Sequence, residues 1–323
     1  MNRTRRLLSI AAASGLGLAG RPAAAQLSSD KPITLVVPFT AGSATDQLAR
    51  ALGQAISRAT PYQVVVENRP GANAFIGAQT VARAPRDGHT ILIGTNTTHA
   101  ANQHLFKKLP YDPVNDFEPL CLLARGAQIL IVNNDLPARD VHDLVDLARA
   151  RPGKLTFGSG SSSSRIAGEL FKQMTGTFIV HIPYRSNPPA VTDLIGGQID
   201  MMITDMATGL PQVRNGKVRA LGVSSLKRAS LAPEIPTISE AGVTGYEMIF
   251  WFAAYVPAGT PAPVIARLNQ IMTAANRGPA MTKFYADVGF EALNGSPQTL
   301  RRFQADEAEK WGRIITKSGI EKE

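Results

Sequence analysis

The sequence predicts an α/β protein of two lobes, each built around a mainly parallel sheet. Strand-like apolar runs alternate with helical patterns along most of the chain, which is typical of parallel sheets covered by helices on both faces. A strand–loop–helix unit with a loop of small residues occurs in each half, at residues 41–45 and 158–164. Two such units indicate two lobes that face one cleft.

The first half of the chain begins this alternation. Residues 33–37 form an apolar run that predicts a strand, and residues 48–56 place apolar side chains on one face of a helix. Further strands are expected at 62–67 and 90–93, with a helix at 74–84 between them. Turns rich in Pro and Gly separate these elements.

The second half repeats the pattern. We expect strands at 155–157, 178–181, 200–203 and 218–223, and helices at 140–150, 166–174, 191–195, 264–275 and about 300–315. Two long extended stretches, 117–132 and 250–256, suit strands that cross between the lobes. These crossings predict a lobe 1 of residues 27–123 plus 249–323, and a lobe 2 of residues 124–248.

The N-terminus has the features of an export signal. Basic residues at 3–6 precede a short apolar stretch, and three alanines before Gln26 fit a cleavage site, so residues 1–25 are expected to be a signal peptide. The segment is compatible with either Sec or twin-arginine export. No later apolar run approaches the roughly 20 residues of a spanning helix. We therefore expect a periplasmic protein.

Composition excludes several classes of function. The net charge of the chain is +9, and four of these charges are arginines of residues 1–25, which leaves +5. The remaining basic residues are scattered, so nucleic acid is not an expected partner. Cys121 is the only cysteine and sits in an apolar run, which excludes a disulfide framework and a cysteine metal cluster. The five histidines form no metal-binding pair, and we expect no metal and no cofactor.

Residues 41–45 predict a seat for a carboxylate or another anion. The loop joins a strand to a helix, and its small residues allow a ligand to approach the backbone N–H groups that open the helix. The helix dipole adds a preference for negative charge. The alternative is an ordinary strand-to-helix turn that binds nothing.

Other candidate binding positions follow strands of the same sheets. Ligands of parallel α/β sheets lie beyond the carboxyl ends of the strands, where Thr95, the 158–164 loop, Thr204 and Asp205 are expected. The threonines after Gly94 are equally suited to helix capping, and the serine-rich loop could be a flexible linker. That loop lacks the G-x-S-x-G pattern of a nucleophile elbow.

At the level of motifs, the chain resembles the Bug family, the periplasmic solute-binding receptors of tripartite tricarboxylate transporters. The resemblance covers nearly the whole mature chain and is carried by motifs in a specific order: Val37-Pro38-Phe39 with Asp46 and Ala49-Arg50, Glu67-Asn68-Arg69-Pro70-Gly71, Asp87-Gly88-His89-Thr90, Ala167-Gly168-Glu169-Leu170-Phe171, Ile182-Pro183-Tyr184-Arg185, Asp193-Leu194-Ile195-Gly196-Gly197, Arg219-Ala220-Leu221, Pro236-Thr237 and Pro257-Ala258-Gly259-Thr260-Pro261. It implies a type II periplasmic-binding-protein-like fold that closes on a carboxylate-bearing solute, and delivery of that solute to membrane transporter components.

The resemblance and the loops together define an expected binding set. Its members are Phe39, Ala41, Gly42, Ser43, Ala44, Thr45, Thr95, Gly158, Ser159, Ser161, Thr204 and Asp205. Phe39, Tyr184 and Trp251 are candidates for stacking on an aromatic ligand, with core packing as the alternative.

Three departures from the family pattern concern the ligand. Ser43 replaces a glycine, Arg165 stands where a histidine is common, and Thr204 stands where an aspartate is common, with Asp205 next to it. These changes favour a neutral or anionic distal group over an ammonium. Dicarboxylates, aromatic carboxylates and small amino-acid-like acids all remain candidates.

An enzyme and a sensor are the alternative classes of function. An enzyme would need a base such as Asp46, which we instead expect to brace the first helical turn through nearby N–H groups. We therefore predict no catalytic residues. A sensor that presents its ligand-closed form to a signalling partner is the alternative to transport. We expect the protein to be a monomer.

Overall fold

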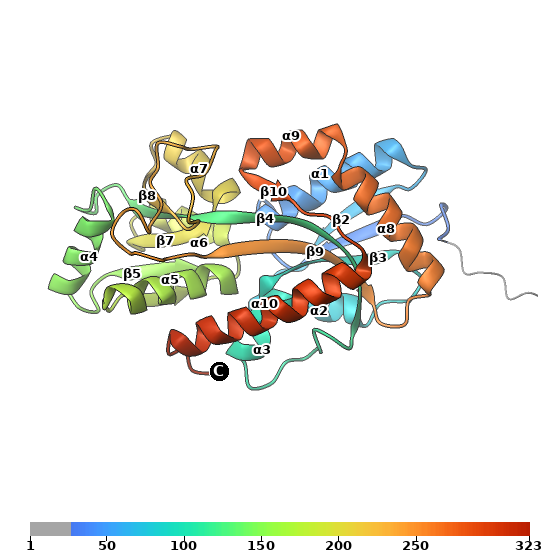
Figure 1. The fold of residues 1–323 in the computed structure, drawn as a ribbon, viewed down its shortest axis with the longest axis horizontal. Coiled ribbons are helices and arrows are strands. Elements are labelled where there is room, and N and C mark those ends of the chain that lie inside the picture. Colours follow the sequence, from blue (N-terminus) through green and yellow to red (C-terminus); the bar gives the residue numbers. More distant parts are fainter. Residues whose placement is uncertain (1–26) are drawn as a thin grey trace, which may run out of the picture.

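The computed structural model describes residues 27–323, so the predicted signal peptide lies outside the described residues. Within 27–323, no helix combines the length and apolar character needed to cross a membrane. Ten strands form one continuous sheet system, which the long strand β4 (Phe117–Asn133) divides into the sheets of two lobes. Figure 1 shows β4 running through both lobes, beside β9 (Ile249–Pro257).

The sheet of lobe 1 has a parallel part and an antiparallel part. The parallel strands are β1 (Ile33–Val37), β2 (Val64–Asn68) and β3 (Thr90–Thr95). Strand β9 pairs antiparallel with β3, then β4 pairs with β9, and the short β10 (Phe290–Ala292) closes the edge. Strand β1 reads ITLVV and is almost entirely buried, as expected for a parallel strand covered on both faces.

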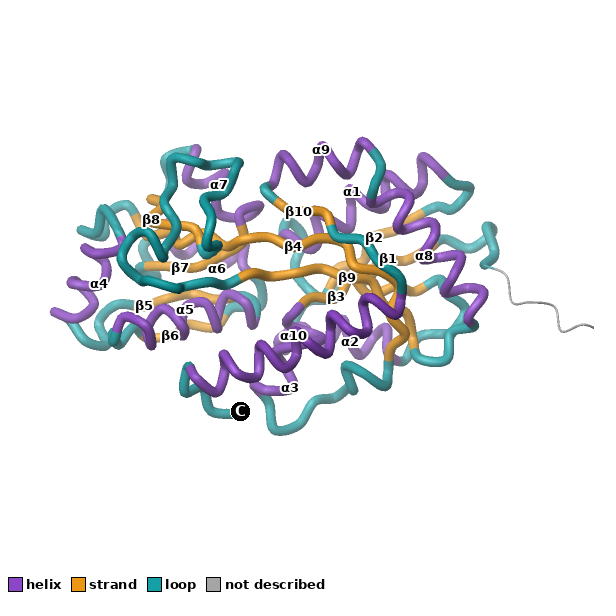
Figure 2. The backbone as a smooth tube through the Cα atoms, viewed as in Figure 1, coloured by secondary structure: helices purple, strands orange, loops and turns teal. Residues whose placement is uncertain are grey.

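The sheet of lobe 2 repeats this organisation. Its parallel strands are β5 (Thr156–Ser159), β6 (Val180–Pro183) and β7 (Met201–Asp205). The second half of β4 pairs antiparallel with β7 on one edge and with β8 (Val218–Val223) on the other. Two mainly parallel sheets joined by crossing strands are therefore confirmed (Figure 2).

Helices cover the sheets of both lobes. The helices that follow lobe 1 strands are α1 (Ala44–Ala59), α2 (Phe75–Ala82), α3 (Asn102–Leu105), α8 (Ala262–Asn276), α9 (Pro279–Val288) and α10 (Pro297–Lys317), with short turns η1 (Ala72–Ala74) and η2 (Thr97–Ala101). Those of lobe 2 are α4 (Val141–Ala150), α5 (Ser162–Thr175), α6 (Asn187–Ile195) and α7 (Met206–Arg214). The long α10 lies across the front of the molecule in Figure 1, below the crossing strands.

Strand β4 changes its partner strands along its length, and the position of this change can be compared with the predicted boundary between the lobes. Residues 117–127 of β4 pair with β9, and residues 128–132 pair with β7. The structural change therefore falls between Ala127 and Gln128, a short distance beyond the predicted boundary at residue 123. The boundaries themselves remain a prediction.

One loop differs from its expected form. Helix α5 begins at Ser162, whereas the sequence pattern placed its start at Ile166. Ser161 caps the helix by accepting a hydrogen bond from the N–H of Ser164, so much of the serine run is helical rather than loop. The serine-rich stretch is thus not a linker, and the α5 N-terminus lies closer to the strand end.

Candidate functional site

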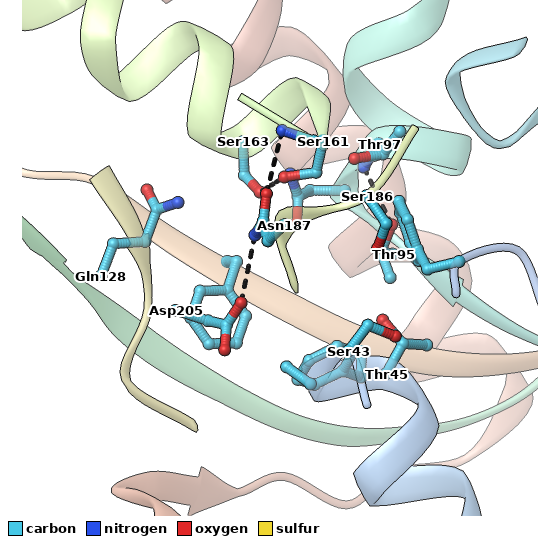
Figure 3. A pocket seen from close by; sticks show the side chains of 16 residues that line it. Ser43, Thr45, Thr95, Thr97, Gln128, Ser161, Ser163, Ser186, Asn187 and Asp205 are labelled. Carbon is cyan, nitrogen blue, oxygen red and sulfur yellow. Dashed lines mark hydrogen bonds between the residues drawn. The ribbon is translucent and has the colours of Figure 1, made fainter. Parts of the chain in front are cut away.

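A pocket lies between the lobes, beside the crossing strands. It contains about 400 Å³ of space free of protein atoms, part of which is open to solvent. Its lining comes from both lobes: Phe39, Ser43, Ala44, Thr45, Thr95, Asn96, Thr97, Gln128, Gly160, Ser161, Ser163, Ser186, Asn187, Asp205, Phe250 and Phe252. Figure 3 shows these side chains around the interlobe pocket.

Four helices begin at the pocket. The residues that immediately precede α1, α5, α6 and α7 are Ser43, Ser161, Ser186 and Asp205, and all four line it. Each helix N-terminus carries roughly half a positive charge and unpaired N–H groups. The pocket is therefore electropositive through its backbone.

No cationic side chain lines this pocket, since Asp205 is the single charged residue in its lining. Negative charge on a ligand has to be stabilised there by main-chain N–H groups and neutral side chains. This is the chemistry expected of an anion site at helix N-termini.

At the start of α1, part of the N–H groups are already engaged. The N–H of Gly42 donates to Asp46 Oδ2 at 2.9 Å, and the N–H of Ser43 donates to Thr40 O at 3.2 Å. The N–H groups of Ala44 and Thr45 have no partner within the described chain. These two N–H groups are available to a carboxylate. They belong to the first two residues of α1 rather than to the loop before it.

Asp46 holds the loop in place. Its carboxylate accepts from Gly42, from Arg50 Nε at 3.0 Å and from Asn68 Nδ2 at 3.0 Å, and its own N–H donates to the Ser43 hydroxyl. Burial acts to raise the pKa of the Asp46 carboxyl, but the hydrogen bonds from Arg50, Gly42 and Asn68 outweigh burial and lower it. Asp46 is absent from the pocket lining, so its geometry is that of a brace.

On the lobe 2 side, Asn187 joins two segments of the pocket wall. Its Oδ1 accepts the N–H of Gly160 at 3.0 Å, and its Nδ2 donates to Asp205 Oδ2 at 3.1 Å. A Cβ at position 160 would lie 1.9 Å from the backbone carbon of Ser186, so only glycine permits this close approach. The α5 and α6 N-termini are therefore locked side by side.

Three polar atoms in the lining lack partners within the described chain. They are Asn96 Nδ2, Gln128 Oε1 and Ser186 Oγ, and their residues are at most 1% exposed. Buried polar groups are nearly always hydrogen-bonded. Unpaired groups that line a pocket point to a bound ligand or water that completes them.

Next to the pocket residues Thr97 and Ser161, contacts join the two lobes directly. The N–H of Ser162 in lobe 2 donates to Thr97 Oγ1 at 3.2 Å, and the Ser162 hydroxyl donates to Asn102 Oδ1 at 2.9 Å. Arg165 in the same helix pairs with Glu323 at 2.6 Å. The structure is thus a form in which the lobes touch.

Seven of the sequence-predicted residues meet at this pocket: Phe39, Ser43, Ala44, Thr45, Thr95, Ser161 and Asp205. The other five do not line it. Ala41 and Gly42 are exposed in the loop before α1, Gly158 lies in β5, and Thr204 is buried beneath Asp205. Ser159 makes a 2.7 Å hydrogen bond with His181 on the neighbouring strand.

The expected set omits nine lining residues. Four of them lie in segments that the sequence analysis placed at the strand ends, after Gly94 and at 158–164, namely Asn96, Thr97, Gly160 and Ser163. The sequence analysis did not single out the other five, which are Gln128, Ser186, Asn187, Phe250 and Phe252. The Asn-Pro-Pro sequence at 187–189 was an available signal for a helix start, since proline favours the first turn. Of the stacking candidates, Phe39 lines the pocket. Tyr184 donates its hydroxyl to Asp193 Oδ2, and Trp251 is buried against Phe303.

Cys121 and His99 are buried as structural residues. Burial raises the pKa of the Cys121 thiol to about 12 and lowers the pKa of His99, which stacks on Tyr255, to about 3. Over residues 27–323, no cluster of three or more His, Cys, Asp or Glu side chains is arranged to hold a metal ion.

This fold, with a pocket between two lobes, defines the class of solute-binding receptors. Residues 48–320 match the sequence model of the family described as "Tripartite tricarboxylate transporter family receptor", and the chain belongs to that family. A relative from Pseudomonas sp. (strain P51), "UPF0065 protein in tcbD-tcbE intergenic region", is 38% identical over 88% of this chain and 85% of its own. Protein BugT of Bordetella pertussis is 32% identical over 99% of both chains, which agrees with the Bug resemblance.

Solved structures support the same assignment. R. palustris Rpa4515 with adipate superposes with a TM-score of 0.87 and 36% identity, over 90% of this chain and 97% of that one. MatC from Rhodopseudomonas palustris with bound malate superposes with a TM-score of 0.83 and 29% identity, over 88% of this chain and 99% of that one. The type II binding-protein fold is therefore confirmed.

Proposed function

We propose that this chain is an extracytoplasmic receptor that closes around a small carboxylate-bearing solute and delivers it to a tripartite tricarboxylate-type membrane transporter. The observation that carries the proposal is the convergence of four helix N-termini on an interlobe pocket without a cationic side chain. The family membership and the adipate and malate of two similar structures support it.

The first contact of the solute is with lobe 1. Its carboxylate accepts from the N–H groups of Ala44 and Thr45, assisted by the Ser43 and Thr45 hydroxyl groups. Lobe 2 then adds Ser161 and Asp205 with their neighbours. Only a solute that makes better contacts in the closed form shifts the equilibrium between the open and closed forms. The closed form is therefore populated only when a solute of the right kind is bound.

The transporter recognises the closed form, in which both lobes present one continuous surface. Periplasmic location follows from the predicted signal at residues 1–25 and from relatives such as the periplasmic binding protein BugD. We expect the protein to perform this role as a monomer.

Thermal melting across a panel of carboxylic acids tests the proposal. Adipate, malate, aromatic carboxylates and amino acids are compared with the corresponding neutral amides. A solute that binds the native state raises the melting temperature in a concentration-dependent way. We expect at least one acid to do so and its amide to have no effect. A panel in which no acid raises the melting temperature contradicts the proposal.

Delivery is tested separately, in vesicles that contain the transporter's membrane components. We expect the receptor loaded with the solute from the screen to drive uptake of that solute, and the empty receptor to drive none. Tight binding without uptake would favour the sensor role.

A further inference from the structure

We propose that the interlobe pocket selects an acid with a hydrocarbon body, in which the carbon next to the carboxylate carries no hydroxyl group. The residues that carry this inference are Phe39, Phe250 and Phe252, called here the aromatic base. The inference deepens the proposed function and rests on it, because the carboxylate of the solute binds the N–H groups at the start of α1.

The aromatic base is the end of the hydrophobic core of lobe 1. Phe39 follows β1, while Phe250 and Phe252 lie two residues apart on β9 and therefore project from the same face of that strand. All three line the pocket, are at most 6% exposed and belong to one apolar cluster. The rings of Phe250 and Phe252 pack edge to face, with their centroids 5.2 Å apart. The side chains of the base offer carbon atoms only.

The aromatic base adjoins the proposed carboxylate site. Ala44 begins α1, its N–H has no partner within the described chain, and its side chain belongs to the same apolar cluster as the base. A carboxylate bound to the N–H groups of Ala44 and Thr45 therefore brings the next carbon atoms of the solute to these apolar side chains. Contact between the two removes apolar surface from water, which favours binding.

The polar side chains of the lobe 2 wall are largely engaged with one another. The hydroxyl groups of Ser161 and Ser163 are 3.0 Å apart, and Asn187 uses both ends of its amide, on Gly160 and on Asp205 (Figure 3). A hydroxyl on the second carbon of the solute would lose its hydrogen bonds to water and meet the aromatic base. The cost of an unpaired polar group therefore disfavours 2-hydroxy acids.

The far end of the solute faces the N-termini of α5, α6 and α7, which favour a negative group. Monoacids and diacids with a hydrocarbon body are therefore both compatible with the aromatic base.

Three matched pairs of acids test the inference by titration calorimetry with the full chain. Each pair compares an acid with its 2-hydroxy form: hexanoate with 2-hydroxyhexanoate, succinate with malate, and phenylacetate with mandelate. In every pair of which a member binds, we expect the unsubstituted acid to bind about tenfold more tightly, as for one unpaired buried hydroxyl. The comparison of phenylacetate with hexanoate shows whether the base prefers a ring or a chain.

Substitutions test the assignment to the aromatic base. Phe250→Leu removes a ring from the pocket lining, so the affinity for the unsubstituted acid should fall several-fold. Phe290→Leu is the matched control, because Phe290 packs on Phe250 and Phe252 at centroid distances of 5.4 and 5.5 Å but does not line the pocket. We expect the control to lower the melting temperature of the unliganded protein similarly and to leave the affinity unchanged.

The outcomes separate this inference from the proposed function. A 2-hydroxy acid that binds as tightly as its parent, or more tightly, overturns the inference and leaves the receptor role intact. Equal affinities of Phe250→Leu and Phe290→Leu also overturn it. If none of the three pairs binds, the acid with the largest thermal shift is compared with its own 2-hydroxy form, and a polar group on its second carbon already overturns the inference. If no acid raises the melting temperature, both proposals fail.

Discussion

Asp46 shows how one residue supports the pocket without touching the solute. Its carboxylate collects the Gly42 N–H, the Asn68 amide and Arg50 in a site where its side chain is 4% exposed. We expect Asp46→Asn to lower the free energy of unfolding by roughly 1.5–3 kcal/mol, the cost of weakening hydrogen bonds to a charged group. Urea unfolding of the unliganded protein at pH 7 measures this change.

The same variant has a defined pH dependence. The pKa of Asp46 is lowered in the folded protein, so its contribution is fully present above the unfolded pKa of about 3.9 and is lost as the pH falls through the folded value. The stability gap between wild type and Asp46→Asn should therefore narrow below about pH 4. Asp306→Asn, at an exposed position of α10, serves as the control. A gap that is unchanged at pH 3 would contradict the brace.

At the residue scale, the sequence predicts loop and strand-end positions well and strand-borne positions poorly. Ser43, Ala44 and Thr45 follow from a strand–loop–helix pattern, because small residues before a helix carry a visible signal. Gln128 and Phe250 lie within crossing strands that are buried along most of their length. Such strands do not alternate apolar and polar residues. The sequence pattern therefore does not indicate which of their side chains face the pocket.

Helix α1 allows its N–H groups to be tested one by one. Ala44→Pro places proline at the first helical position, which tolerates it, and removes an N–H that is available to the carboxylate. We expect unchanged stability and an affinity at least about tenfold weaker for the acid from the screen, as for loss of a hydrogen bond to a charged group. Calorimetry gives the affinity and a melting curve gives the stability.

Ser43→Pro is the matched comparison. Its N–H is bonded to Thr40, and Ser43 has a φ of −65° that proline adopts. This variant therefore loses a loop bond, the cap and the assisting hydroxyl, but no N–H that is available to the carboxylate. It should lower stability more than Ala44→Pro and affinity less. The reverse order would place the carboxylate at Ser43.

Among the elements, β8 was predicted with its observed bounds, whereas α7 and α9 were not predicted. Helix α7 contains Pro211 and Gly209, which lower its helical signal, and it forms because Asp205 caps it and its apolar side chains pack on β4 and β8. Tertiary packing of this kind is not visible in a local pattern.

For the whole molecule, the proposed function requires closure on the solute. Small-angle scattering should give a smaller radius of gyration with a saturating acid than without it, because the lobes rotate together about β4 and β9. An acid that saturates the protein without changing the radius of gyration would contradict the hinged trap.

The contacts between the lobes predict a second effect on closure. Ser162 lies outside the pocket lining but bonds to Thr97 and Asn102 of the other lobe. Ser162→Ala removes the bond to Asn102, so affinity should fall by the roughly 0.5–1.5 kcal/mol of one neutral hydrogen bond. Calorimetry measures the change, and Ser239→Ala, at a lobe 2 hydroxyl bonded within its own lobe, is the control. Equal affinities of the two variants would mean that this contact does not stabilise the closed form.

The backbone N–H groups at the start of α1 also constrain how the chain can evolve. A point mutation exchanges a side chain and leaves the peptide N–H in place, with proline as the exception. If these groups bind the solute's carboxylate as proposed, nearly every substitution in this segment leaves the carboxylate site in place. The lobe 2 side chains Asn187 and Asp205 have no such protection, since one substitution replaces each of them. Under the proposed function, descendants of this gene would change solute by single substitutions at that end and retain the acid group at the other.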